Sequence, residues 1–189
     1  AGHRGHVPPV KHNVLGLEIT ADRGIVKRAT HRELGPRQAA QWVRPDEMSQ
    51  AFNFGYMFTE WNAPALRAVI DESLKAFGGV GAPSTWVLSN HDVVRHASRL
   101  ALTADSPQGA GIGPKSAGKP NEALGLRRAR AATSLMLALP GSHYLYQGEE
   151  LGLPEAMELP DSARQDPTWF RTNGEKYGRD GCRVPIPWE

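Results

Sequence analysis

The sequence predicts an α/β fold built on parallel strands. Three short runs rich in aromatic and β-branched residues, at 51–58, 84–89 and 142–148, alternate with two helical patterns at 62–79 and 121–141. Parallel strands cannot be joined by tight hairpins, so this alternation indicates successive right-handed βαβ units on one sheet. The length of 189 residues is that of a single domain with one sizeable core.

The first strand and the first helix are predicted from residue type and spacing. The run "AFNFGYMF" at 51–58 is short and aromatic-rich, which favours a strand. In the next segment Asn62 is suited to cap a helix and Pro64 to occupy its first turn. Apolar residues recur there at helical spacing until Gly78 and Gly79 end the pattern.

The second strand is predicted from the near-continuous apolar run "STWVLS" at 84–89, which is typical of a parallel strand covered on both faces. Residues 97–122 are dense in Gly, Pro, Ser and Lys, which indicates a helical turn followed by a long surface loop. The segment 121–141 then predicts an amphipathic helix. Its expected apolar positions are Leu124, Ala131, Leu135 and Leu139.

The third strand is predicted from "SHYLYQG" at 142–148, a short Tyr- and Leu-containing run. The tail at 152–189 has five prolines and no sustained periodicity. We therefore expect it to be an excursion from the sheet and not a further domain.

Composition argues against several classes of protein. Hydrophobic residues make up 40% of the chain, and no apolar run approaches the roughly 20 residues that span a bilayer. The basic, His-rich first 40 residues lack the aromatic interleaving typical of nucleic-acid-binding surfaces. One cysteine, Cys182, cannot form an internal disulfide and favours a reducing compartment. We expect a cytoplasmic protein with no membrane or nucleic-acid partner; its oligomeric state has no signature in the sequence.

Polar side chains follow two of the predicted strands where each strand ends. Asn90, His91 and Asp92 come after 84–89, and a cluster around Gln147 follows the next strand. The carboxyl ends of parallel strands face one crevice, so these groups are candidates for one site. The members of the second cluster are Gln147, Glu149 and Glu150.

Three kinds of chemistry fit this pattern. A carboxylate beside an imidazole binds sugar hydroxyls, and its charge stabilises a developing oxocarbenium ion. The same pair together with His96 is a conceivable metal site, although its spacing spans a strand-to-helix turn. A Ser-His-Asp triad using Ser89 is less favoured, because the sequence has no Gly-x-Ser-x-Gly elbow.

The segment "WVLSNHDVVRH" at 86–96 resembles the seventh-strand signature of the α-amylase superfamily, glycoside hydrolase family thirteen, in which Asn-His-Asp follows an apolar strand. Three further segments are similar to this family in the same order, at 42–54, 135–155 and 179–188. Together they resemble intracellular bacterial α-glucosidases and oligo-α-glucosidases over roughly residues 38–189.

The resemblance implies part of a (β/α)₈ TIM barrel, with the three strands as strands six to eight and their helices. It implies that Asp92 stabilises the transition state and that His91 and Asn90 line the glucose subsite. Arg95, close after the triplet, either reaches the site or pairs with a nearby acid. Arg179 and Asp180 belong to a motif that resembles a loop near the aglycone side, and Arg183 in the same motif is less favoured as a site residue. The expected substrate is an α-glucoside such as a malto- or isomalto-oligosaccharide, with no cofactor and no metal.

Two catalytic carboxyl groups of the family have no match in the sequence. The nucleophile belongs to a Gly-x-Arg-x-Asp motif, and "GHRGH" at 2–6 lacks the aspartate. The general acid is a glutamate about a dozen residues before the position of Trp42, where Thr30 stands. Residues 1–37 do not resemble the family. We therefore expect an incomplete α-glucosidase chain, or else a non-catalytic carbohydrate-binding remnant; a metal-dependent hydrolase is the third alternative.

Overall fold

The computed structural model describes residues 35–102 and 111–187. Residues 1–34, and with them most of the basic segment and both regions searched for catalytic carboxyl groups, lie outside the described part. In chain order the elements are α1 (Pro36–Ala40), η1 (Gln41–Val43), α2 (Phe54–Met57), α3 (Ala63–Gly78), β1 (Thr85–Val87), α4 (His96–Arg99), α5 (Glu122–Leu137), β2 (Ser142–Tyr144), η2 (Asp161–Ala163), α6 (Pro167–Arg171) and η3 (Asp180–Cys182).

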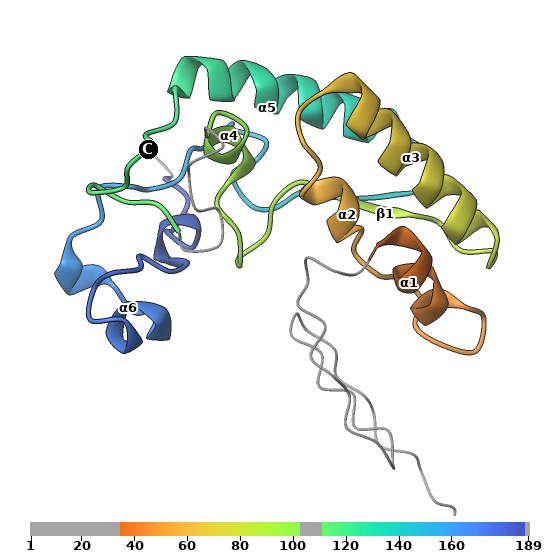
Figure 1. Cartoon of the computed structure of the whole chain (residues 1–189), viewed down its shortest axis with the longest axis horizontal. Helices are drawn as coiled ribbons and strands as arrows, with labels where there is room; N and C mark the ends of the chain where they lie inside the picture. The colour runs from red at the N-terminus through yellow and green to blue at the C-terminus, as the bar shows by residue number, and fades with distance from the viewer. Residues whose placement is uncertain (1–34, 103–110, 188–189) are drawn as a thin grey trace, which may run out of the picture.

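A small parallel sheet organises the chain. β1 and β2 pair in parallel with Trp86 opposite His143, and Phe52 forms a parallel bridge with Thr85. Because Thr85 also pairs with Ser142, β1 lies between Phe52 and β2. α3 and α5 lie along one side of these strands (Figure 1). The α/β class with parallel strands joined through helices is confirmed.

The strand predicted at 51–58 is wrong over most of its length. Only Phe52 is bridged to the sheet, and the residues after it form α2. Asn53 causes the change, because its side-chain oxygen accepts a hydrogen bond of 3.0 Å from the Tyr56 main-chain nitrogen and so caps a helical turn. Its amide nitrogen donates to Ser73 Oγ at 2.7 Å, which fixes the turn against α3.

The predicted cap at Asn62 is confirmed, and the second long helix also begins at an asparagine cap, which was not predicted from the sequence. The Asn62 side chain accepts from the Ala65 main-chain nitrogen at 2.8 Å, and Asn121 accepts from that of Leu124 at 2.9 Å. The predicted buried positions of α5 are wrong in part, because Ala131 is exposed. The buried face of α5 consists of Gly125, Ala129, Ala132 and Met136. Small residues on this face let α5 approach α4 closely.

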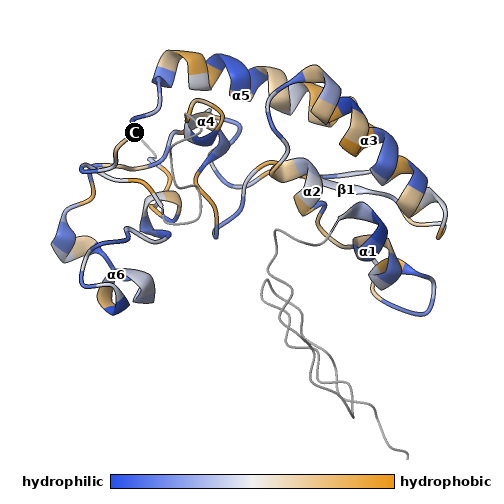
Figure 2. Ribbon diagram, viewed as in Figure 1, coloured by the Kyte–Doolittle hydropathy of each residue, from blue (hydrophilic) through white to orange (hydrophobic). Residues whose placement is uncertain are grey.

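The main core lies between the sheet and the long helices. Its buried members are Tyr56, Trp86, Leu88, Ala132 and Met136. The Trp86 indole nitrogen donates to the Pro140 oxygen at 2.9 Å, so the largest buried side chain also satisfies its polar group. Hydrophobic and hydrophilic residues alternate along α3 and α5 (Figure 2). None of the described helices combines the length and apolar character needed to cross a membrane.

The predicted loop at 97–122 begins with the helical turn α4, and its residues 103–110 lie outside the described part of the chain. The tail at 152–187 has only short helical turns, as its prolines indicate. It nevertheless contains buried residues and returns to the carboxyl end of β1. Figure 1 shows this tail with α6 on the side of the molecule away from α1.

Arg95 holds the tail against the residues that follow β1. Its side chain is enclosed, with the residue only 2% exposed, and donates to the main-chain oxygens of Gln147 at 2.7 Å and Cys182 at 3.0 Å. Its main-chain nitrogen donates to Glu155 Oε2 at 2.9 Å, and the guanidinium lies 5.1 Å from the ring centre of Tyr146. One buried arginine therefore joins three segments that are distant in sequence.

We predict that Gly125→Ala destabilises the protein. Alanine normally stabilises a helix relative to glycine by about 1 kcal/mol. At Gly125, however, a Cβ atom would overlap the main-chain oxygen of Ala97 and force α5 away from α4. We expect a loss of about 1–3 kcal/mol in urea denaturation. The matched control is Gly78→Ala in α3, where a Cβ atom meets nothing within 4 Å and the change should be neutral or stabilising.

We also predict a pH-dependent contribution from Glu155. Burial raises the pKa of Glu155 to about 7 from 4.5, against the hydrogen bond from Arg95. Between these values the unfolded chain releases a proton that the folded chain keeps, so stability from this group falls as the pH rises and is constant above about 7. The stability of wild type relative to Glu155→Gln should fall by about 3 kcal/mol between about pH 4.5 and 8. Parallel pH profiles of the two proteins in urea denaturation would contradict the prediction.

Candidate functional site

The triplet predicted from the sequence follows β1 after two intervening residues, Leu88 and Ser89. Asn90 is buried and acts within the protein: its Oδ1 accepts a hydrogen bond of 2.7 Å from the Asp92 main-chain nitrogen, and its amide nitrogen lies 3.8 Å from Met57 Sδ. These contacts bend the chain so that His91 and Asp92 leave the core. Asn90 therefore sets the position of its two neighbours.

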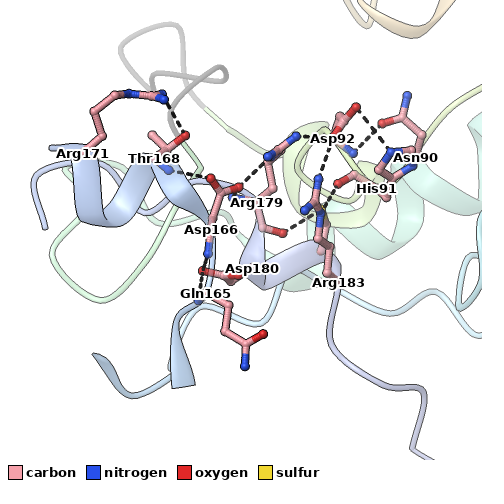
Figure 3. Close-up of polar contacts among 11 residues, drawn as sticks. Asn90, His91, Asp92, Gln165, Asp166, Thr168, Arg171, Arg179, Asp180 and Arg183 are labelled. Carbon is pink, nitrogen blue, oxygen red and sulfur yellow. Dashed lines mark hydrogen bonds and ion pairs between the residues drawn. The ribbon is translucent and has the colours of Figure 1, made fainter. Parts of the chain in front are cut away.

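Among the described residues, two arginines bind the same oxygen of Asp92. Arg179 and Arg183 each donate to Oδ1 at 2.7 Å. The other oxygen, Oδ2, lies 3.5 Å from His91 Nε2. The side chains of Asp92 and His91 are 21% and 42% exposed, so both side chains are partly accessible from solvent. Figure 3 shows the two arginines and His91 grouped around the carboxylate.

Arg183, in the tail, contacts two residues of the triplet. Arg183 Nε donates to the main-chain oxygen of His91 at 2.7 Å while its NH2 group holds Asp92. Sequence reasoning placed Arg183 last among the candidates, yet the structure gives it two bonds to the triplet. The motif at 179–188 was the available signal, because it contains both Arg179 and Arg183.

A second carboxylate, Asp166, lies behind Arg179 and was missed in the sequence. It accepts hydrogen bonds from Arg179 Nε at 2.6 Å, from the Arg179 main-chain nitrogen at 3.0 Å and from that of Thr168 at 2.7 Å. Burial alone would raise the pKa of Asp166, but these hydrogen bonds outweigh burial and hold the pKa well below its ordinary value. Asp166 is therefore ionised and pairs with Arg179.

Arg95, a further candidate, lies in the interior and not beside the exposed face of Asp92. Both terminal nitrogens of its guanidinium donate to main-chain oxygens of the protein. The sequence left open whether Arg95 reaches the site or pairs with a nearby acid. In the structure its guanidinium donates to main-chain oxygens, and its main-chain nitrogen is the group that donates to Glu155. Arg95 supports the site by fixing the segment that contains Cys182, next to Arg183.

The polar residues that follow β2 also serve the framework. Glu149 is buried, with Oε1 3.2 Å from His96 Nδ1 and Oε2 accepting from the Tyr146 main-chain nitrogen at 3.0 Å. Glu150 accepts from the Gly148 main-chain nitrogen at 2.9 Å. These carboxylates fold the turn after β2 and do not join the arginine cluster on Asp92.

The metal alternative does not fit the geometry. His96 is buried in contact with Ser89 Oγ at 3.1 Å and Thr133 Oγ1 at 3.3 Å, whereas His91 lies at the surface beside Asp92. Among the described residues no group of three or more His, Cys, Asp and Glu side chains is arranged to hold a metal ion. The contacts of Ser89 with His96 also leave it buried, unlike an exposed nucleophile.

The two partly exposed residues of the triplet, His91 and Asp92, suit a polyhydroxylated ligand. Asp92 Oδ2 accepts hydrogen bonds and His91 Nε2 either donates or accepts, so the pair can bind adjacent hydroxyl groups. A carboxylate in this position also stabilises positive charge that develops on a sugar ring.

Comparison with known proteins gives a consistent result. Residues 36–189 match the family model of the alpha amylase catalytic domain. A stretch of 104 residues is 40% identical to a probable alpha-glucosidase of Rhizobium meliloti (strain 1021), covering 55% of this chain and 15% of that protein. An alpha-glucosidase of Apis mellifera and maltase A1 of Drosophila melanogaster are each 26% identical over 144 residues, or 73% of this chain.

The chain spans only 15% to 21% of the length of these relatives. The family's catalytic domain is a (β/α)₈ barrel, and the described residues form a partial α/β section. The match to the family model includes all the described elements and agrees with the resemblance of the four motifs. The chain belongs to the α-amylase catalytic-domain family of glycoside hydrolases.

Proposed function

We propose that this chain supplies the sugar-binding side of an α-glucosidase active site. The observation that carries the proposal is that the two oxygens of Asp92 have different partners. Two arginines donate hydrogen bonds to Oδ1, and Oδ2 lies beside His91 Nε2. The substrate class we propose is an α-glucoside such as a malto- or isomalto-oligosaccharide. The alpha-glucosidase relatives support this choice.

The bonds to Asp92 favour a binding and transition-state-stabilising role over nucleophilic attack. Two guanidinium groups donate charge-assisted hydrogen bonds to its Oδ1, which draws electron density from the carboxylate. Such a group is a weaker nucleophile than a free carboxylate. Its remaining charge still favours an oxocarbenium-like transition state through Oδ2.

We further propose that Phe52, β1 and β2 belong to strands six, seven and eight of the barrel. They are adjacent, parallel and in chain order, with α3 and α5 as the crossover helices. Consecutive neighbouring strands joined through helices are what a (β/α)₈ barrel requires. In a barrel the catalytic groups lie at the carboxyl ends of the strands, which is where Asp92 lies.

Hydrolysis with retention requires two carboxyl groups about 5–5.5 Å apart, one as nucleophile and one as acid. We propose that these groups come from outside the described residues. Sugar binding without hydrolysis is the second candidate function. It is favoured by the fact that His91, Asp92 and their two arginines all lie in the described part of the chain and contact one another there.

We predict that maltose binds this chain and that Asp92→Asn weakens binding about tenfold or more, because a hydrogen bond to a charged group is replaced by one to a neutral amide. Chemical-shift titration by NMR measures the affinity. The control is Asp71→Asn, an exposed carboxylate of α3 that pairs with Arg67 and lies outside the site. Equal affinities for wild type and Asp92→Asn would contradict the assignment.

An aryl α-glucoside distinguishes the two candidate functions. We expect this chain alone to show no turnover, because its sequence has no match to the two motifs that hold the family's catalytic carboxyl groups. Turnover that Asp92→Asn abolishes would instead establish hydrolysis by this chain. Release of the aryl group, followed by absorbance, is the measurement.

A further inference from the structure

Asp166 is a buried carboxylate in the tail that the proposed sugar contacts do not use. It is only 1% exposed, although it lies in a segment with little regular structure. Ionised groups are rarely buried in this way unless every oxygen is satisfied. Here Oδ1 accepts from Thr168, and Oδ2 accepts twice from Arg179.

The tail is shaped to bring Asp166 to Arg179. Gly178 has a φ of +68°, and a Cβ atom there would lie 2.7 Å from Asp166 Cγ, so a side chain at this position would push the carboxylate away. Asp180 Oδ2 accepts from the main-chain nitrogens of Gln165 at 3.1 Å and Asp166 at 3.0 Å. The two aspartates thus tie both segments of the tail to each other (Figure 3).

Arg179 uses different nitrogens for its two partners. Nε donates to Asp166, and NH1 donates to Asp92 Oδ1. A guanidinium is planar and rigid, so fixing Nε also fixes the direction in which NH1 points. The Arg179 side chain is 39% exposed, and without Asp166 it would be free to adopt other rotamers in solvent.

We propose that Asp166 is a positioning residue for the sugar-binding carboxylate. It orients Arg179, and Arg179 holds Oδ1 of Asp92, so that Oδ2 is the oxygen presented to the ligand beside His91. The proposal rests on the proposed sugar-binding function. It adds a residue far from Asp92 in the chain that acts on the site without touching the ligand.

The test measures maltose affinity by NMR titration in Asp166→Asn, Arg179→Lys and the double variant. Each single change should weaken binding about tenfold. Asp166→Asn weakens the contact that orients the Arg179 guanidinium, and Arg179→Lys replaces a guanidinium that bonds two carboxylates with a single ammonium group. The double variant should bind no more weakly than either single one, since both act through the same contact. Asp161→Asn is the matched control: it removes a tail carboxylate that is 74% exposed and faces Arg164.

A second readout separates positioning from a merely structural role. In wild type the Arg179 Nε–H proton is held by Asp166 and should give a ¹H–¹⁵N signal that exchanges slowly with water. Asp166→Asn should lose that signal while its other amide signals stay dispersed. If Asp166→Asn does not fold, Arg179→Lys, at a partly exposed position, still tests the coupling to Asp92.

The outcomes distinguish this inference from the proposed function. Wild type that binds maltose, with Asp166→Asn and Arg179→Lys binding equally well, overturns the positioning role and leaves the sugar site intact. Wild type that does not bind maltose overturns both. Weakening by both variants, with a neutral Asp161→Asn control, supports the positioning role.

Discussion

The parallel pairing of β1 with β2 is the constraint on which the site depends. It places Thr85 opposite Ser142 and brings the carboxyl ends of both strands to one edge. A shift of the β1–β2 pairing by one residue would turn the buried Trp86 side chain to the opposite face of the sheet. The triplet that follows β1 would be displaced as well. The register is fixed where the chain enters β2: Ser142 donates to the Ser84 oxygen at 2.9 Å, and Gly141 adopts a φ of +131°.

Buried cations organise the tail, which has little regular structure. Arg95 joins the segments after β1 and β2 to Cys182, and Arg164 lies against the rings of Trp169 and Tyr177 at 4.9 and 4.6 Å. Guanidinium groups are suited to this because they offer several donors in a plane and also stack on aromatic rings. The desolvation of these charges is offset by main-chain oxygens and ring faces, so the tail has a defined path without a core of its own.

The features that depend on local sequence could be predicted, and those that depend on distant contacts could not. The cap at Asn62, the start of α5 after Asn121 and the position of the triplet beyond β1 follow from residue type and the neighbouring pattern. The aromatic run at 51–58 misled because Asn53 makes a cap and a bond to Ser73 that outweigh strand preference. The pairing of Arg179 with Asp92 joins residues 87 positions apart, and no periodicity in the proline-rich tail indicates it.

The charges around Asp92 also bear on the kind of ligand that the site accepts. Asp92 and Asp166 contribute two negative charges, and Arg179 and Arg183 contribute two positive charges, so the four groups sum to zero. The charges of these four groups therefore compensate one another within the cluster. What the cluster presents is a pair of hydrogen-bonding groups, Asp92 Oδ2 and His91 Nε2, in a fixed orientation. Adjacent hydroxyl groups can engage both groups at once, so the sugar-binding role proposed above depends on the relative orientation of these two side chains.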